Sequence, residues 1–209
     1  MEESRNLSYL IRKLTEEKIE RLLMEDPWSR AMLAKLRRGI GKQPGEQPEL
    51  FEILLNNVPE DLYGKGDEVS KPVWAIYTAL TLFALHQQGN EQPMSNSGNA
   101  EGKKQGNSLG TAVGYLVKKN DEDRKSAVKR RFDAVITANE FTEFAYHARS
   151  LIQLLKAEKI TLDYPHLAED FYWYQFDEVR NRIRMRWGED FYRIAQRNDH
   201  KENGGVCNE

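Results

Sequence analysis

Apolar residues recur at helical spacing along almost the whole 209-residue chain, and this repeat is the strongest constraint on its fold. Apolar positions three and four residues apart lie on one face of an α-helix, whereas a half-buried strand alternates apolar and polar residues. The helical spacing is clear near both ends of the chain, in Leu7, Leu10, Ile11 and Leu14 and again in Val179, Ile183, Trp187 and Phe191. No stretch alternates like a strand, so the sequence predicts an all-α protein.

Polar residues mark where several of these helices begin. A short polar side chain before the first turn accepts a hydrogen bond from the backbone, and proline is favoured at the first helical position. The predicted N-cap residues are Asp26, Ser108, Asp121, Asn139 and Asp163. Residues 72–85 are almost wholly apolar, but they are fewer than the about 18 that suggest a membrane span. This segment therefore predicts a buried central helix.

The composition changes at Gln87. Residues 87–107 are rich in Gly, Asn, Ser and Gln, which predicts a flexible polar loop. The loop divides the chain into a predicted N-terminal helical lobe at residues 1–86 and a C-terminal helical lobe at residues 108–195. Residues 196–209 are polar and predict a disordered tail.

The cysteine content and the hydropathy indicate a cytoplasmic protein. A single cysteine, Cys207, excludes a disulfide within the chain and fits a reducing compartment. The N-terminus is polar and acidic and lacks the apolar core of a signal peptide. At 39% hydrophobic residues and a mean hydropathy of −0.75, the chain has enough apolar side chains for a core and a strongly charged surface.

Basic residues are concentrated between residues 103 and 131. Nine basic residues against three acidic ones give this segment a charge of +6, while the whole chain carries −2. The basic residues are Lys103, Lys104, Lys118, Lys119, Arg124, Lys125, Lys129, Arg130 and Arg131. Only a local excess of positive charge favours nucleic-acid binding, because the charges that face the phosphates release their condensed counterions. Charged runs on helices are usually only solvated faces, so the charge alone leaves both interpretations open.

Two other runs are better explained by internal contacts. Four arginines spaced by two residues, from Arg180 to Arg186, spread around a helix and have acidic neighbours, which favours internal salt bridges and protein contacts. The aromatic run from Phe171 to Phe176 could stack on bases, but its helical spacing favours a place in the core.

The sequence contains no dense catalytic or metal-binding motif. Glu143 and His147 share a helix face, and Asp163 and His166 lie near a helix start, but nothing like H-E-x-x-H is present. Locally bonded side chains are the favoured interpretation of both pairs. No phosphate-binding G-K-[ST] follows the glycines at every fourth position, which are Gly98, Gly102, Gly106 and Gly110. We therefore expect no enzyme activity, no cofactor and no metal.

Short segments occur in a characteristic order along the chain. They are A-K-L-R-R-G at 34–39, L-F-A-L-H at 82–86, G-N-S-L-G-T-A-V-G-Y-L at 106–116, V-K-R-R-F-D-A-V-I-T-A at 128–138, H-A-R-S-L-I-Q-L-L-K at 147–156, L-D-Y-P-H-L at 162–167 and W-G-E-D-F-Y at 187–192. Over roughly residues 25–195, this series resembles the CasB family, the small subunit of the type I-E CRISPR surveillance complex called Cascade.

The resemblance implies an elongated helical bundle with two small helical lobes and no catalytic activity. It implies two copies within Cascade, next to the backbone and large subunits, the guide RNA and the target DNA, and no membrane. Sequence-independent contacts with the nucleic-acid backbone would stabilise the R-loop and the displaced strand during antiviral defence. The family's basic positions fall on Arg37, Arg38, Lys118, Lys119, Arg130, Arg131 and Arg149. The first helix and the tail look like additions.

Two alternatives remain beside this interpretation. A helical scaffold would hold the subunits of a complex together without touching nucleic acid. A small metal-dependent helical enzyme would bind its metal at Glu143 and His147.

Overall fold

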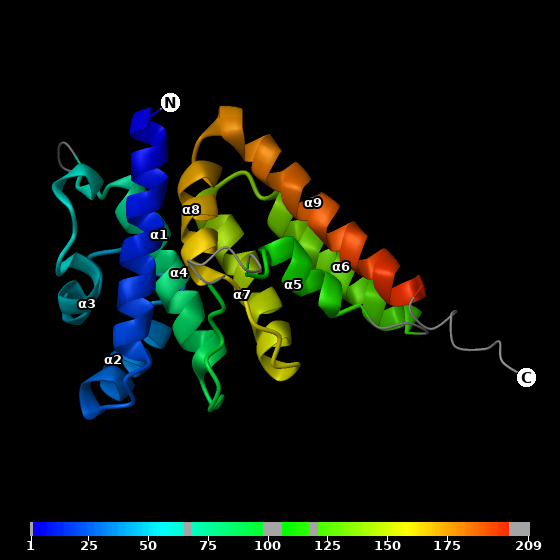
Figure 1. Cartoon of the computed structure of the whole chain (residues 1–209), viewed down its shortest axis with the longest axis horizontal. Helices are drawn as coiled ribbons and strands as arrows, with labels where there is room; N and C mark the ends of the chain where they lie inside the picture. The colour runs from blue at the N-terminus through cyan, green and yellow to red at the C-terminus, as the bar shows by residue number, and fades with distance from the viewer. Residues whose placement is uncertain (1, 65–67, 98–105, 118–120, 201–209) are drawn as a thin grey trace, which may run out of the picture.

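The computed structural model describes residues 2–64, 68–97, 106–117 and 121–200, and in these ranges the chain is all-α, as predicted (Figure 1). The α-helices are α1 (Glu2–Leu22), α2 (Pro27–Arg38), α3 (Phe51–Leu55), α4 (Lys71–Gln87), α5 (Leu109–Tyr115), α6 (Glu122–Thr137), α7 (Phe141–Ala157), α8 (Tyr164–Tyr174) and α9 (Asp177–His200). Two short 3-10 helices, η1 (Pro48–Leu50) and η2 (Glu60–Leu62), flank α3. Within the described ranges, no helix combines the length and apolarity needed to cross a membrane.

Four of the five predicted N-caps are confirmed. The side chains of Asp26, Ser108, Asp121 and Asp163 each accept a hydrogen bond from a backbone N–H in the first turn of the helix that follows. These bonds satisfy donors that the helix leaves without an internal partner, and so they determine where α2, α5, α6 and α8 begin.

The predicted N-cap at Asn139 is wrong. Glu140 occupies the N-cap position of α7 and makes no side-chain cap. The Oδ1 atom of Asn139 instead accepts a hydrogen bond from Nη2 of Arg184 on α9, at 3.3 Å. A contact with a distant helix has replaced the local bond, and a single-sequence pattern does not contain that information.

The central helix α4 is buried on almost all sides, as predicted. It packs against α1, α2, α7 and α8, and its side chains belong to one cluster of buried hydrophobic residues. Its first turn is capped by Ser70, whose Oγ accepts from the backbone N–H of Val73 at 3.2 Å. The helix runs two residues beyond the predicted segment, to Gln87, whose Oε1 accepts from the backbone N–H of Met94 at 2.9 Å.

The helices form two groups that do not follow chain order. Figure 1 shows α5, α6 and α9 extending to one side of the group that contains α1 to α4 and α8. Helix α7 joins the two groups, because it packs against both α4 and α6. The division into lobes at residues 1–86 and 108–195 stays a prediction, but the core runs across it, since α1 and α4 pack on α8.

The part of the predicted loop before residue 98 is attached to the core. Met94 is buried, and its backbone O accepts from the N–H of Leu162 at 3.1 Å. The backbone N–H of Asn96 donates in turn to the O of Leu162 at 3.0 Å, which forms a lone parallel bridge at Ser95. Residues 98–105 of the predicted loop lie outside the described residues.

The predicted disordered tail begins too early. Helix α9 continues to His200, so residues 196–200 are helical, and residues 201–209 lie outside the described ranges. The buried residues Ile194 and Ala195 anchor this end of α9. Extending an existing helix adds one hydrogen bond for each residue fixed, so a polar sequence is enough to continue it.

A buried histidine makes the stability of the fold depend on pH. His86 is fully buried, its Nδ1 lies 3.1 Å from the hydroxyl of Tyr164, and burial lowers the pKa of His86 to about 4. The unfolded chain, with a histidine pKa near 6.5, binds this proton first as the pH falls, so stability decreases from about pH 6.5 down to about pH 4. Between pH 7 and pH 5, His86 is expected to account for about 2 kcal/mol of lost unfolding free energy.

Urea denaturation at both pH values checks this expectation. A His86→Gln variant should lose about 2 kcal/mol less than the wild type between pH 7 and pH 5. His147→Gln, which changes a half-buried histidine on α7, is the matched control. The same pH dependence in His86→Gln and wild type would contradict the assignment.

Candidate nucleic-acid interface

Arg130 and Arg131 are carried by α6, whose inner face is apolar. Val128, Phe132 and Val135 are buried, and the Phe132 ring stacks on Phe191 of α9 at 4.8 Å between centroids. Arg130 lies on the opposite side of the helix and is exposed. Arg131 lies at the edge of the buried face, where its Nη1 donates to the backbone O of Ala127 at 3.2 Å. Among the described residues, no acidic side chain forms a salt bridge with either arginine.

The other described cations of the same basic segment are neutralised. Arg124 pairs with Glu158 at 2.6 Å, Lys125 with Glu122 at 3.6 Å and Lys129 with Asp133 at 2.6 Å. The hydrogen bond with Asp133 also raises the pKa of Lys129. The charge of +6 counted along the sequence therefore overstates the charge available to a ligand. On α6 that charge is concentrated on Arg130 and Arg131.

Arg149 lies on α7, which packs between α4 and α6. The buried face of α7 consists of Phe144, Ala148, Leu151, Ile152 and Leu155. Arg149 is exposed and forms no salt bridge with an acidic side chain in the described part of the chain. Because α6 packs directly on α7, the structure brings the unpaired cations of α6 and α7 to neighbouring helices.

Arg37 and Arg38 form the last turn of α2, where positive charge is favourable for the helix dipole. Arg38 is exposed and Arg37 is half-buried, and burial lowers the pKa of Arg37. The guanidinium still stays charged, because its ordinary pKa lies far above neutral pH. Within the described ranges, neither side chain forms a salt bridge with an acid.

The segment after α2 connects this pair to α7. Lys42 lines a narrow crevice of about 40 Å³, together with Thr142 and Ala145 from the first turns of α7. Arg149 is four residues beyond Ala145 and so lies one turn further along the same side of α7. Lys42 is an exposed cation that the sequence did not single out, because its neighbours indicate only a turn.

Lys118 and Lys119, the other two predicted contacts, lie outside the described residues. They stand between the end of α5 and the capping residue Asp121 of α6.

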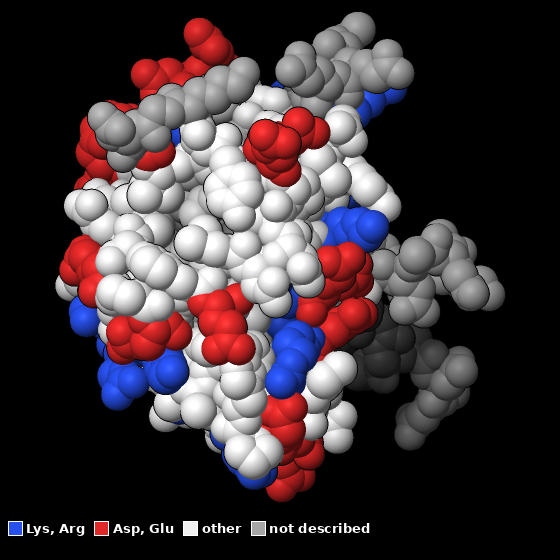
Figure 2. All heavy atoms as spheres, turned by 90° about the vertical axis from the view of Figure 1, so that its left-hand side faces the viewer, with Lys and Arg blue, Asp and Glu red and all other residues white. Residues whose placement is uncertain are grey.

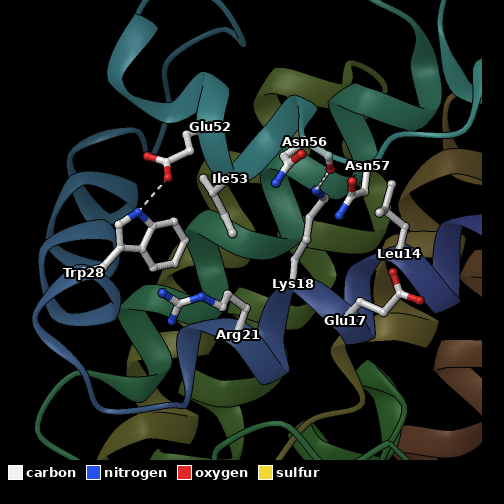
Figure 3. A pocket seen from close by; sticks show the side chains of 9 residues that line it. All are labelled: Leu14, Glu17, Lys18, Arg21, Trp28, Glu52, Ile53, Asn56 and Asn57. Carbon is white, nitrogen blue, oxygen red and sulfur yellow. Dashed lines mark hydrogen bonds between the residues drawn. The ribbon is translucent and has the colours of Figure 1, made fainter.

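The cationic side chains that line a pocket on another face of the molecule already have partners within the protein. It has a volume of about 360 Å³ and lies between α1, α2 and α3 (Figure 3). The buried Nζ of Lys18 donates to the backbone O of Asn56 at 2.9 Å, and burial lowers the pKa of Lys18 to about 8. Arg21 lies over the Trp28 ring at 4.1 Å, and the indole donates to Glu52 at 2.9 Å. Figure 2 shows acidic groups interspersed with basic ones on this side of the molecule.

The arginine run on α9 is held mainly by internal contacts, as predicted. Arg180 pairs with Asp177 at 2.7 Å, Arg184 donates to the backbone O of Ala138 at 2.6 Å, and Arg186 pairs with buried Asp170. The aromatic run lies largely in the core, where Phe171, Tyr172 and Tyr174 are buried.

The residues of the alternative metal site do not form a set of metal ligands in the described ranges. Nε2 of His147 lies 3.8 Å from Oε1 of Glu143, and no group of three His, Cys, Asp or Glu side chains there could hold an ion. Asp163 contacts the backbone N–H of His166 as a helix cap, at 3.0 Å.

The chain is similar to proteins of one family. A family model described as CRISPR-associated protein Cse2 matches residues 32–192. The crystal structure of CasB from Thermobifida fusca is 26% identical, with a TM-score of 0.68 over 89% of this chain and 97% of that one. A Cse2-family protein from Thermus thermophilus is 22% identical, with a TM-score of 0.60 over 87% and 97%.

A chain of a CRISPR RNA-guided surveillance complex has the same fold, with 15% identity and a TM-score of 0.68 over 92% of this chain and 99% of that chain. No curated protein matches this sequence. The solved structures cover more of the chain than the segment matched by the family model.

Proposed function

The chain belongs to the Cse2 family of CRISPR-associated proteins, which includes CasB, and on that premise we propose that it is the non-catalytic small subunit of a type I-E Cascade complex. In this role it binds nucleic-acid backbones without regard to sequence and stabilises the R-loop and the displaced strand. Its partners are the backbone and large subunits, a second copy of itself, the guide RNA and the target DNA, in the cytoplasm. The shared fold with a chain of an RNA-guided surveillance complex supports this placement.

One observation carries the nucleic-acid part of the proposal. Arg130, Arg131 and Arg149 lie on two helices that pack together, and in the described structure none forms a salt bridge with an acid. Their neighbours Arg124 and Lys129 are paired with acids. Cations left without an acidic partner keep a positive charge that can attract phosphates.

Formation of an R-loop exchanges one duplex for another of nearly equal stability. Modest contacts with the nucleic-acid backbone are therefore enough to shift the equilibrium toward the R-loop. Each phosphate neutralised releases condensed counterions, which makes the contribution strongly dependent on salt. Contacts with phosphates carry no sequence information, as a complex that accepts any guide requires.

Replacing Arg130, Arg131 and Arg149 together with alanine is expected to weaken target-DNA binding by the assembled complex. Losing three phosphate contacts should reduce the slope of log affinity against log salt by about 2 to 3. The measurement is a DNA titration of the complex at several salt concentrations. Lys118→Ala with Lys119→Ala is tested as a separate pair.

The matched control removes the same charge at cations that already have acidic partners. Arg12, Lys13 and Arg193 are exposed and pair with Glu169, Glu17 and Asp190. The control triple variant should keep the wild-type salt slope. An unchanged affinity and slope in the Arg130, Arg131 and Arg149 variant, or an equal change in the control, would refute the nucleic-acid role.

A scaffold role without nucleic-acid contact is the second candidate, and α9 supports it. Met185 is 64% exposed beside exposed Arg182, and Met and Arg are enriched at protein interfaces. Under this role, Arg182→Ala with Met185→Ala would impair assembly of the complex, while the Arg130, Arg131 and Arg149 variant would bind DNA normally.

A further inference from the structure

Tyr146 on α7 projects an aromatic ring into solvent. At 71% exposure it is the most exposed large hydrophobic side chain in the described part of the chain. Its ring meets His147 edge-on, with centroids 5.4 Å apart and an angle of 73° between the planes. The core therefore does not use this ring.

The surroundings of Tyr146 are polar and basic. Arg149 follows three residues later on the exposed side of α7, and exposed Gln153 continues the same stripe for another turn. Arg130 and Arg131 lie on the neighbouring helix α6. The ring is thus exposed on the same helix as Arg149, and the helix that carries Arg130 and Arg131 packs against this helix.

An acidic residue, Glu143, lies three residues before Tyr146 on α7. Glu143 is exposed, but its Oε2 accepts from the backbone N–H of Asn139 at 3.3 Å. Its Oε1 lies 3.8 Å from Nε2 of His147. The carboxylate therefore serves as a hydrogen-bond acceptor for the backbone at the start of its own helix.

We infer that Tyr146 is a stacking platform for an unpaired base, with Arg149 beside it on the phosphate of the same strand. Residues three apart on a helix have Cβ atoms about 5–6 Å from each other, a separation that one nucleotide can span between base and phosphate. An aromatic ring stacks on any base, so the contact keeps the sequence independence of the site. This inference rests on the proposed function and narrows its ligand to a single strand with unstacked bases.

Binding of single-stranded DNA by the full-length chain tests the inference. Two probes of equal length are used, oligothymidylate and the same backbone without bases, and affinity is measured by fluorescence anisotropy at low salt. Tyr146→Ala is expected to bind oligothymidylate roughly 10-fold more weakly than wild type and the abasic strand equally well. Tyr146→Phe keeps the ring and should retain wild-type affinity for both probes.

Two controls separate the ring from the charge. Tyr9→Ala removes a tyrosine on α1 that is 54% exposed and should leave both affinities unchanged. Arg149→Ala should weaken binding to both probes, because both carry phosphates. An effect of Tyr9→Ala on oligothymidylate equal to that of Tyr146→Ala would overturn the inference.

The remaining outcomes distinguish the inference from the proposed function. If Arg149→Ala weakens both probes and Tyr146→Ala weakens neither, the stacking inference is overturned and the backbone contact stands. Impaired complex assembly with unchanged DNA binding in Tyr146→Ala overturns it too, because the ring then contacts a protein. If neither the arginine variants nor Tyr146→Ala changes binding to either probe, the proposed function fails together with the inference.

Discussion

A Gly110→Ala variant is expected to lose about 3 kcal/mol of unfolding free energy. Gly110 lies in α5, which packs closely on α9, and a Cβ atom at this position would be 2.0 Å from the backbone O of Trp187. A backbone atom cannot rotate away as a flexible side chain can, so one helix must shift against the other. Gly114, one turn later, also lies close to α9, because its Cβ position is 2.8 Å from Cβ of Ile194 and 3.0 Å from the backbone O of Phe191.

Gly188→Ala is the matched control for this variant. Gly188 lies within α9, and a Cβ added there would meet nothing within 4 Å. Alanine should stabilise α9 there by up to about 1 kcal/mol, because glycine has the lower helix propensity. The opposite signs of the two effects are measured by urea denaturation at pH 7. A Gly110→Ala variant as stable as wild type would show that α5 and α9 are not packed this closely.

Replacing Asp170 with alanine is expected to cost about 3 kcal/mol of unfolding free energy. Asp170 is 3% exposed and lies on α8, where its Oδ2 accepts from Nε1 of buried Trp187 at 2.8 Å. Its Oδ1 pairs with Arg186, and Nε2 of His166 lies 3.7 Å away. Alanine would leave the buried indole N–H without its acceptor and the partly exposed guanidinium of Arg186 without its acidic partner, and an unsatisfied buried donor is destabilising.

The neighbouring acid provides the control. Glu169 pairs with Arg12 at 3.3 Å, and the Arg12 side chain is 49% exposed. Such surface pairs contribute at most about 1 kcal/mol, so Glu169→Ala should change the denaturation midpoint little. Equal effects of Asp170→Ala and Glu169→Ala would mean that Asp170 is not a buried link between α8 and α9. Asp170→Asn, which keeps one acceptor oxygen, should fall between the two.

Much of the fold follows from short-range patterns. Apolar spacing predicted an all-α protein and a buried central helix, and four polar residues cap helices where the sequence predicts them. The N-cap predicted at Asn139 is wrong because the side chain of Asn139 accepts a hydrogen bond from Arg184 of α9. Short-range patterns do not contain such a contact with a distant helix. The continuation of α9 past residue 196 has a similar origin, since packing of Ile194 and Ala195 holds a helix that its polar sequence did not predict.

The candidate site, too, was predicted from the sequence in part and required the structure for the rest. The charge count along the sequence included Arg124, Lys125 and Lys129 together with Arg130 and Arg131, and only the resemblance to the CasB family set the last two apart. Packing of α6 against α7 brings Glu158 to Arg124, and this contact joins residues 34 positions apart. Which cations stay unpaired is therefore a property of the folded chain.

The glycines at every fourth position show the same limit of prediction from sequence. The sequence shows that Gly110 belongs to no phosphate-binding motif, but it contains no sign of the role that the structure reveals. That role is to let the α5 backbone approach Trp187 on α9, a residue 77 positions later in the chain.

Local sequence was sufficient for the helical class, for the starts of α2, α5, α6 and α8 and for the family, because these depend on residues within a few positions of one another or on their order along the chain. Only the folded structure decided how α7 and α8 group with α1 and α4, and that α6 packs on α7. It also decided which three cations of the basic segment are neutralised. Each depends on which helix surfaces meet. That choice is made by shape and charge over the whole core, and no short stretch of sequence contains it.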